Sequence, residues 1–444
     1  MKDSTLEMSF PAVRSKTIVG RFDGGEVTSD AGVMLVREAD RKMGLSERMA
    51  EVAGDRRQRG KVTHTIEEMI RERVYAICLG YEDANDLDLL GSDPALKSAC
   101  GRLPSENDLA SQPTISRLEN SVTRKDLLEM GMGIAETVVS GLPKSTRRVI
   151  LEVDVTDDPC HGQQEFEFFS GYYDEHCYLP LYVHITGGDG RRRLIAALLR
   201  HGKAYATVGL FGTLSRVVRL LRDRFPGIKV ILRADGSFGV EEVISWCEGN
   251  GVDYVLGLST NKKLAALSTP VQMDAALKYK WEGDGCREYG EFVYRAKTWA
   301  IERRVIVKAE ITKGELAPRY VVTNLGRSPR RLYEFYCRRG DQENRIKEMK
   351  LDLLSGRTSC HRFLANQFRL LLHTAACILM GTLSEALEGT EWAKAQVGTI
   401  RLRLLKVGAR VVETCRKIWL HLPTSFPEKE AWVRAHRRLV RHGE

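Results

Sequence analysis

The stretch RVILEVDVT, residues 148–156, predicts a buried β-strand, because apolar residues dominate it and only Glu152 and Asp154 interrupt them after Arg148. An acidic side chain among valines and leucines is unfavourable unless a cation neutralises its charge. This strand therefore introduces carboxylates into a segment that otherwise belongs inside a sheet, and the neighbouring segments are interpreted outward from it.

Strand-like and helical segments follow this stretch in a regular order. Further strands are expected first, and then helix, strand, helix and strand. This is the element order of a ribonuclease-H-like fold, an α/β sheet with helices on both faces. The expected strands cover 166–173, 178–186, 193–199, 228–234 and 253–258, and the expected helices cover 208–224 and 240–249.

In the second half of the chain, the sequence predicts that an inserted segment interrupts this alternation of strands and helices. Residues 265–332 indicate a β-rich insertion, because Val, Tyr, Ile and Trp alternate roughly within 289–325. A strong helix over about 332–352 and a more apolar helix over 362–382 follow it. We therefore expect a core over residues 146–264 and 333–385 and an insertion over residues 265–332. For the C-terminal region, residues 386–444, the sequence predicts no particular fold.

The first 145 residues predict a mostly helical DNA-binding region. Residues 17–27 indicate a short β-hairpin with a Gly-Gly turn. The segment DLASQPTISRLEN, residues 108–120, resembles the turn and second helix of a helix-turn-helix, with Ile115 and Leu118 facing a core. Its outward side chains are of types that read base edges and phosphates, although an ordinary polar helix face has the same pattern. These side chains are Thr114, Ser116, Arg117 and Asn120.

The charge pattern favours an anionic polymer as partner. Lys and Arg together number 68 and Asp and Glu 59, which gives a formal net charge of +9. The excess occurs in clusters, such as Arg191 to Arg193, Arg303-Arg304 and Arg338-Arg339. Basic clusters of this kind are typical of nucleic-acid-binding proteins, although solubility alone is an alternative explanation.

Other classes of protein find little support. The ten cysteines form no CxxC pair, which argues against a structural zinc site and indicates free thiols in a reducing compartment. The N-terminus lacks the apolar core of a signal peptide, and no apolar run is long enough to span a bilayer. The turn at 187–190 lacks the Gly-Lys-Ser/Thr ending of a phosphate loop, so no nucleotide cofactor is expected. We expect a cytoplasmic, nucleoid-associated protein without a membrane partner.

Three separated segments supply candidate catalytic residues. Asp154 lies in the first strand, and Asp235 follows the strand 228–234, at the strand end where open α/β sheets place their sites. A third carboxylate must come from a neighbouring helix, and YCRRGDQENRIKEMK, residues 336–350, provides it. At ~3.6 residues per turn, four of its side chains fall within a stripe roughly 60° wide. They are Tyr336, Arg339, Glu343 and Lys350.

The spacing Tyr-x2-Arg-x3-Glu-x6-Lys in this helix resembles the signature of the YREK group of bacterial DDE transposases. Other stretches are similar to the insertion-sequence 1380 family in particular, and together they cover nearly the whole chain in the expected order. They are GYEDANDLDLLGSDPALK (80–97), LASQPTISRLEN (109–120), DVTDDPCHGQQE (154–165), LRADGSFG (232–239) and RGDQENRIKEMKLD (339–352).

The resemblance implies a ribonuclease-H-like domain with a β-rich insertion between the second Asp and the Glu. It implies cleavage of one strand at each element end, followed by attack of the freed 3′-hydroxyl. Asp154, Asp235 and Glu343 would hold two Mg²⁺ ions, with Mn²⁺ as a substitute, which suits hard oxygen ligands. Arg339 and Lys350 would contact phosphates, and Tyr336 the DNA near the cleaved end.

The expected partners are the terminal inverted repeats and the target DNA, with a homodimer in the DNA-bound complex. Trp299, in the insertion, has two interpretations. Related hairpin-forming transposases stack an insertion-domain tryptophan on a flipped base; the alternative is a core tryptophan of a β-sheet.

Several alternatives stay open. Glu152 is interpreted as non-ligating, whereas Asp157, Asp158 and His161 are rivals of Asp154 as metal ligands. At the level of function, the alternatives are a ribonuclease-H-like nuclease without strand transfer and a DNA-binding protein that has lost catalysis. The presence of all three carboxylates argues against the second.

Overall fold

The computed structural model describes residues 7–440, which divide into two compact units. One, which we call the sheet unit, consists of residues 123–350 and 358–374. The other, the terminal unit, combines residues up to 122 with 351–357 and with the chain from 375 onward. Neither unit is one continuous segment, and the domain boundaries expected from the sequence stay a prediction.

The sheet unit is built on one eight-stranded sheet of order β12-β13-β14-β11-β10-β4-β8-β9. The central strand β4 runs parallel to β10, which runs parallel to β11, whereas β8 and β9 continue from β4 as an antiparallel meander. The bounds of these five strands agree closely with the expected ones. They are β4 Arg148–Val155, β8 Leu181–Thr186, β9 Arg192–Leu198, β10 Lys229–Ala234 and β11 Asp253–Leu258.

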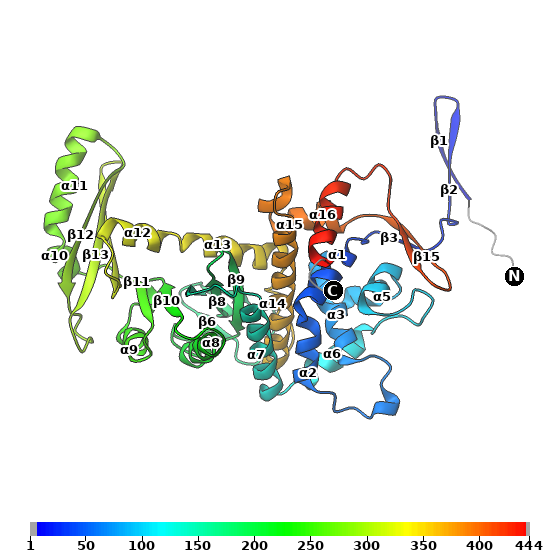
Figure 1. Ribbon diagram of the computed structural model, residues 1–444, viewed down its shortest axis with the longest axis horizontal. Helices are drawn as coiled ribbons and strands as arrows, with labels where there is room; N and C mark the ends of the chain where they lie inside the picture. Colours follow the sequence, from blue (N-terminus) through cyan, green and yellow to red (C-terminus); the bar gives the residue numbers. More distant parts are fainter. Residues whose placement is uncertain (1–6, 441–444) are drawn as a thin grey trace. The chain divides into compact units, whose positions relative to one another are not determined.

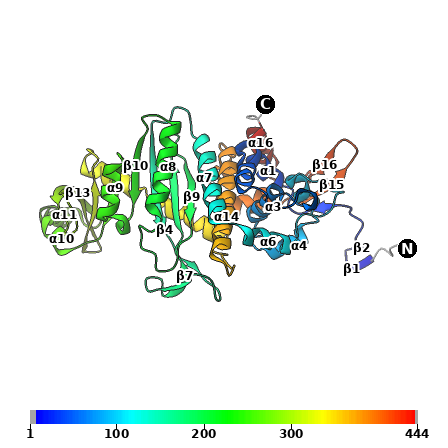
Figure 2. The same cartoon turned by 90° about the horizontal axis from the view of Figure 1, so that it is seen from below.

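Helices cover both faces of this sheet. Figure 1 shows α8 (Leu210–Arg224) and α9 (Glu241–Gly249) on one face and α12 (Pro329–Cys337) on the other, and Figure 2 shows the first face from below. The helix α7 (Arg124–Ser140) packs beside the edge strand β9. In α8 the apolar side chains recur at helical spacing and are buried, which is why this helix lies flat on the sheet.

The insertion extends the central sheet and is partly helical. Its strands β12 (Cys286–Tyr294), β13 (Arg303–Thr312) and β14 (Glu315–Thr323) are antiparallel, and β14 pairs with β11. The β-rich expectation holds for 289–325, but residues 265–285 contain the helix α11 (Thr269–Glu282), which the sequence analysis did not predict. The helix has no clear buried face, since only Ala275 of this helix is fully buried.

A small three-stranded sheet interrupts the chain between β4 and β8. It consists of β5 (Asp158–Pro159), β7 (Glu175–Tyr178) and β6 (Phe168–Ser170), in that order. The expected strand 166–173 is therefore wrong in length: β6 covers three residues and then turns back into β7. This sheet starts only four residues after Asp154 along the chain.

The expected helix 332–352 is interrupted. It consists of α12, then α13 (Gly340–Lys347), then a π-helical turn over Glu348–Asp352. Between α12 and α13 the carbonyl of Phe335 accepts from the buried Arg233 guanidinium, and the N–H of Arg339 bonds instead to the Tyr336 carbonyl at 3.0 Å. Because Phe335 is the ordinary i−4 partner of Arg339, this tertiary contact explains the tightened turn.

The terminal unit is mostly helical. Thr65 caps α3 (Ile66–Leu79) through the N–H of Glu68, and Gly80 ends this helix with a φ of 93°. The expected hairpin at 17–27 is wrong, because β2 (Lys16–Arg21) pairs backward with β1 (Glu7–Val13). The remaining elements are α1 Val33–Met43, α2 Leu45–Ala53, α3 Ile66–Leu79, α4 Leu87–Leu90, α5 Pro94–Cys100, α6 Gln112–Ser121, α15 Val397–Ile400 and α16 Lys429–Val440, with strands β3 Val27–Thr28, β15 Ala409–Glu413 and β16 Ile418–His421.

The helix α14 (Phe363–Ala386) is the expected apolar helix after the interrupted segment. By length and composition alone it could span a membrane, but 78% of its apolar window is buried inside the protein. That degree of burial is characteristic of the core helix of a folded protein.

Candidate active site

Two aspartates meet at one edge of the central sheet. Val153 of β4 pairs with Ala234 of β10, so the next residues of these parallel strands, Asp154 and Asp235, lie side by side at the strand ends. Asp154 is buried, whereas Asp235 is half-buried and accepts hydrogen bonds from the backbone N–H and hydroxyl of Ser237. The sequence predicts Asp154 within the first strand and Asp235 at the carboxyl end of a later strand.

The third acidic side chain comes from α13, and an arginine joins it to the first. The Arg339 guanidinium forms an ion pair with Asp154 at 3.3 Å and with Glu343 at 3.0 Å. Glu343 is itself exposed. The negative charges of Asp235 and Glu343 both act on Asp154, so the three carboxylates lie within electrostatic reach of one another.

The environment of Asp154 favours its neutral form. Burial, which is the largest effect, raises the pKa of this carboxyl to about 6 together with the charges of Asp235 and Glu343 and against the opposing effect of Arg339. A carboxylate in this position gains from any additional cation, because the cation relieves both the desolvation and the repulsion. Arg339 supplies part of that charge in the structure.

The donor set suits a hard divalent cation, although the side chains are not closed around one. Among the side chains that the structure describes, no three of His, Cys, Asp or Glu are placed so that they could hold one ion together. The guanidinium of Arg339 stands between Asp154 and Glu343, and it would have to withdraw for these oxygens to converge. Three carboxylates are the ligand types that Mg²⁺ and Mn²⁺ prefer.

Glu152 is engaged elsewhere. It is fully buried, and its carboxylate accepts from Arg192 at 2.5 Å and from Arg233 at 2.7 Å. Arg192 also donates to the Arg338 carbonyl, as Arg233 does to the segment before α13. Glu152 therefore ties three strands to the α12–α13 segment and is not free for a cation.

The rival acidic residues have partners of their own. Asp157 forms an ion pair with Lys350 at 2.8 Å, so the expected phosphate contact is held beside the first strand. Asp158 is buried, accepts from the Thr358 hydroxyl at 2.7 Å, and has a pKa that burial raises to about 7. His161 is exposed. Asp157 and Asp158 follow Asp154 closely in the chain, but their carboxylates contact Lys350 and Thr358, whereas that of Asp154 contacts Arg339.

A polar cavity of about 330 Å³ lies beside these carboxylates. Its wall includes Gly257, where an added Cβ would come within 2.6 Å of the Tyr336 hydroxyl, so only glycine allows this close approach. Tyr336 is half-buried, packed against Tyr333 with ring centroids 5.9 Å apart. The cationic side chains of the cavity are Arg339 together with Lys308 and Arg319 of the insertion, two residues that the sequence analysis missed.

The family description "Transposase DDE domain group 1" matches residues 10–444, nearly the whole chain. The chain belongs to the DDE transposase family. The family implies a nuclease or transferase activity, and its members generally use divalent metal ions, which agrees with the carboxylates described above. No curated protein gives a significant sequence match.

The transposase places Trp299 in its core. The indole is only 3% exposed, meets the Tyr294 ring edge-on at 5.3 Å, and lies under the Arg303 guanidinium. Arg303 in turn is held by Glu241 and Glu248. A base cannot stack on a ring that is enclosed in this way, so the structure favours the core tryptophan over the base-stacking interpretation.

The four polar residues expected to face outward from α6 differ in exposure. Arg117 is exposed and donates to the Thr114 hydroxyl at 2.9 Å. Asn120 donates to the Ser116 carbonyl, and both are half-buried, like Thr114. Ile115 is fully buried, as the sequence predicted.

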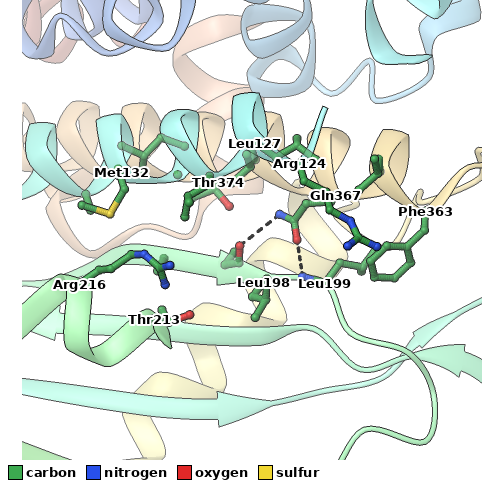
Figure 3. A pocket seen from close by; sticks show the side chains of 18 of the residues that line it. Arg124, Leu127, Met132, Leu198, Leu199, Thr213, Arg216, Phe363, Gln367 and Thr374 are labelled. Atoms are coloured by element: carbon green, nitrogen blue, oxygen red, sulfur yellow. Dashed lines mark hydrogen bonds between the residues drawn. The ribbon is translucent and has the colours of Figure 1, made fainter. Parts of the chain in front are cut away.

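A second cavity of the transposase, about 550 Å³, lies away from the carboxylates (Figure 3). It is enclosed by α7, β9, α8 and α14, and most of its lining side chains are apolar. Gln367 closes one side by accepting from the Leu199 N–H at 2.7 Å and donating to the Ala197 carbonyl. Since its lining contains one acidic residue, Glu165, it offers no second carboxylate set.

Proposed function

We propose that this protein binds the terminal inverted repeats of a mobile element, cleaves DNA strands at the element ends, and joins the freed ends to target DNA by a cut-and-paste route. The observation that carries the proposal is the convergence of Asp154, Asp235 and Glu343 from two strands and a helix around Arg339. We assign the mobile element to the insertion-sequence 1380 family and its transposase to the YREK group.

A ribonuclease-H-like core is part of the proposal. The strands β9-β8-β4-β10-β11 are adjacent in that order, with an antiparallel meander followed by two parallel strands. This order supports the fold expected from the sequence. The three β-strands of the insertion then extend the same sheet beyond β11.

The carboxylates would hold two Mg²⁺ ions, which supply a nucleophilic oxygen and stabilise the charge of an in-line displacement. Asp154 and Asp235 fix the ligand positions at the sheet edge, and Glu343 approaches from α13. Arg339 then leaves its bridging position to contact a phosphate, as Lys350 does from Asp157. Tyr336, Lys308 and Arg319 line the adjoining cavity, where the DNA backbone near the cleaved end would lie.

Other parts of the proposal concern assembly and recognition. The helix α6 contributes Thr114, Ser116, Arg117 and Asn120 to DNA binding in the mostly helical N-terminal region. A homodimer brings two element ends together in the DNA-bound complex. We place the protein in the cytoplasm, at the nucleoid.

An assay with labelled element ends tests the proposal. The wild-type protein with Mg²⁺ should nick the end and, given a pre-cleaved end, join it to a target duplex. Asp154→Ala, Asp235→Ala and Glu343→Ala should each abolish both steps while gel-shift affinity for the end stays nearly unchanged. Glu334→Ala on α12, whose partner is the exposed Arg330, is the matched control and should cleave normally.

Retained nicking in any of the three variants would refute the assignment of that ligand. Cleavage of ends without joining of the pre-cleaved end would favour a ribonuclease-H-like nuclease over a transposase. Binding without cleavage by the wild-type protein at any divalent metal would indicate a protein that has lost catalysis.

A further inference from the structure

The hairpin formed by β6, its turn and β7, residues 168–178, exposes an unusual number of aromatic rings; we call it the aromatic hairpin. Tyr172, at the turn, is 88% exposed, and Phe169 is 47% exposed. Tyr173 meets Tyr172 edge-on with ring centroids 4.8 Å apart, and Phe169 meets His176 edge-on. Clustered exposed aromatic side chains of this kind mark interaction sites rather than ordinary surface.

The aromatic hairpin lies beside the catalytic carboxylates. Its strand β7 pairs with β5, where Tyr178 is opposite Asp158, four residues after Asp154. Tyr173 is close enough to Asp157 and Asp154 for their charges to act on its hydroxyl, whose pKa burial and these charges raise to about 12. A DNA strand whose scissile phosphate reaches Asp154 therefore passes within reach of the hairpin.

The charges around the aromatic hairpin determine whether it contacts the phosphates or the bases of DNA. It contains the acidic residues Asp174 and Glu175, and Glu167 precedes it; these carboxylates repel phosphates, although the Lys203 ammonium lies over the Phe168 ring at 5.4 Å. The cations of the site are Arg339, at the start of α13, and Lys350, in the π-helical turn after it, and they pair with Asp154 and Asp157. A strand whose phosphates are held by these two cations can present its bases to the hairpin, and bases are neutral rings that stack on aromatic side chains.

We propose that the aromatic hairpin stacks on unpaired bases next to the scissile phosphate, with Tyr172 as the foremost ring and Phe169 as the second. The inference rests on the proposed function and assigns to this hairpin the base contact that the buried Trp299 cannot make. The duplex must open next to the cleavage site for the bases to reach these rings, and stacking stabilises the opened form.

Photocrosslinking tests the contact directly. End duplexes carry 5-iododeoxyuridine at each nucleotide flanking the cleavage site, and the complex is irradiated without divalent metal so that the DNA stays intact. Mass spectrometry of the wild-type protein should identify crosslinks to Tyr172 or Phe169. Crosslinks confined to other segments would overturn the proposal.

Kinetics provide the second readout. Tyr172→Ala combined with Phe169→Ala should slow cleavage of a fully paired end about ten- to a hundredfold, since stacking on one ring is worth about this factor. Mismatching the flanking base pairs should recover much of the loss, because the duplex is then already open. Tyr172→Trp should cleave nearly as fast as wild type. Trp281→Ala, which removes an equally exposed ring from α11, is the control.

The outcomes separate this inference from the proposed function. Wild-type cleavage together with unchanged rates in the double alanine variant would overturn the stacking role alone, whereas absence of cleavage by the wild type would overturn both. A defect that mismatches do not relieve, accompanied by loss of a dimer in sedimentation, would assign the hairpin to contact with a second copy of the chain and overturn the stacking role.

Discussion

A single arginine sets the charge balance among the catalytic carboxylates at the residue scale. Arg339 contacts both Asp154 and Glu343, and it opposes the rise in the Asp154 pKa that burial and neighbouring carboxylates cause. In the proposed mechanism the same side chain binds phosphate. Its charge therefore competes with a metal ion before DNA arrives and becomes available once DNA offers a phosphate.

Replacing Arg339 by glutamine should strengthen metal binding in the absence of DNA. Loss of its positive charge leaves Asp154 and Glu343 without their bridging cation, so a divalent ion should bind about tenfold more tightly, equivalent to ~1.4 kcal/mol. Mn²⁺ titration followed by electron paramagnetic resonance measures this affinity. Arg330→Gln, an exposed arginine on α12, should leave it unchanged, and weaker Mn²⁺ binding by Arg339→Gln would contradict the competition.

Metal binding should also fall as the solution becomes acidic. The Asp154 carboxyl has its pKa raised to about 6, so a proton occupies it below that pH and must leave before a cation binds. The apparent Mn²⁺ affinity should be constant above about pH 7 and decrease up to tenfold per pH unit below about 6. Arg339→Gln should move this midpoint upward, because the guanidinium lowers the Asp154 pKa; a midpoint near 4 in the wild type would refute the assignment.

Residue types and spacing predict the carboxylates of the candidate site, whereas burial and strand pairing determine its other residues. Asp154 and Asp235 follow from strands that end at one edge of the sheet, whereas Glu343 follows from spacing along one continuous helix, which the structure interrupts between α12 and α13. Trp299 shows the limit, since an indole in an alternating segment has the same sequence pattern whether it is enclosed or exposed. Lys308 and Arg319 could not be foreseen, because only the pairing of β13 and β14 brings them to the cavity.

At the scale of elements, one buried ionic cluster joins the strands to the α12–α13 segment. Glu152 of β4 contacts Arg233 of β10 and Arg192 of β9, and both arginines donate to carbonyls at the junction of α12 and α13. The cluster thus fixes the position from which α13 presents Glu343. Its stabilising effect depends on complete pairing, because a buried charge without a partner is strongly unfavourable.

Glu152→Gln should therefore destabilise the protein by about 3 kcal/mol or more in urea unfolding, since it leaves the buried Arg233 and the half-buried Arg192 without their carboxylate. Cleavage should fall as well, because α13 loses its support. Glu343→Gln is the contrasting variant: its side chain is exposed, so unfolding should change by less than about 0.5 kcal/mol while cleavage is abolished. Equal stability of the two variants would contradict the structural role of Glu152.

The elements show which physical signals are local. The strands β4, β10 and β11 were predictable because their apolar runs record burial directly. The break between α12 and α13 was not, because it depends on the Arg233 contact with the Phe335 carbonyl, which comes from a residue about a hundred positions away. The helix α11 lacked a clear apolar stripe, so periodicity could not separate it from the β-rich segment that follows.

At the scale of the whole molecule, the terminal unit is assembled from both ends of the chain. The strand β3 pairs with β15, and the N–H groups of Ala31 and Gly32 donate to the carbonyls of Val407 and Leu405. An added Cβ at Gly32 would come within 2.3 Å of the Leu404 carbonyl oxygen, so the two backbones are in direct contact. No local pattern in the sequence predicts this pairing, because it joins segments about 370 residues apart.

A chain that ends at residue 386 should therefore lose the folded N-terminal helices. Truncation removes β15 and α16, which pair with β3 and pack against α1, and it removes Arg401, which donates to the Cys78 carbonyl at the end of α3. Hydrogen exchange should show α1 and α3 unprotected, while β4, β8 and β10 stay protected because their partners all lie in the sheet unit.

Deletion of residues 1–21 is the matched control for this truncation. The strands β1 and β2 form a two-stranded sheet of their own, with nearly all of their side chains exposed, so protection of α1 and α3 should not change without them. If α1 and α3 stay protected in the chain ending at 386, the N-terminal helices form an independent fold, as the sequence-based division at residue 145 implies. Loss of protection in the sheet strands as well would mean that the two units unfold together.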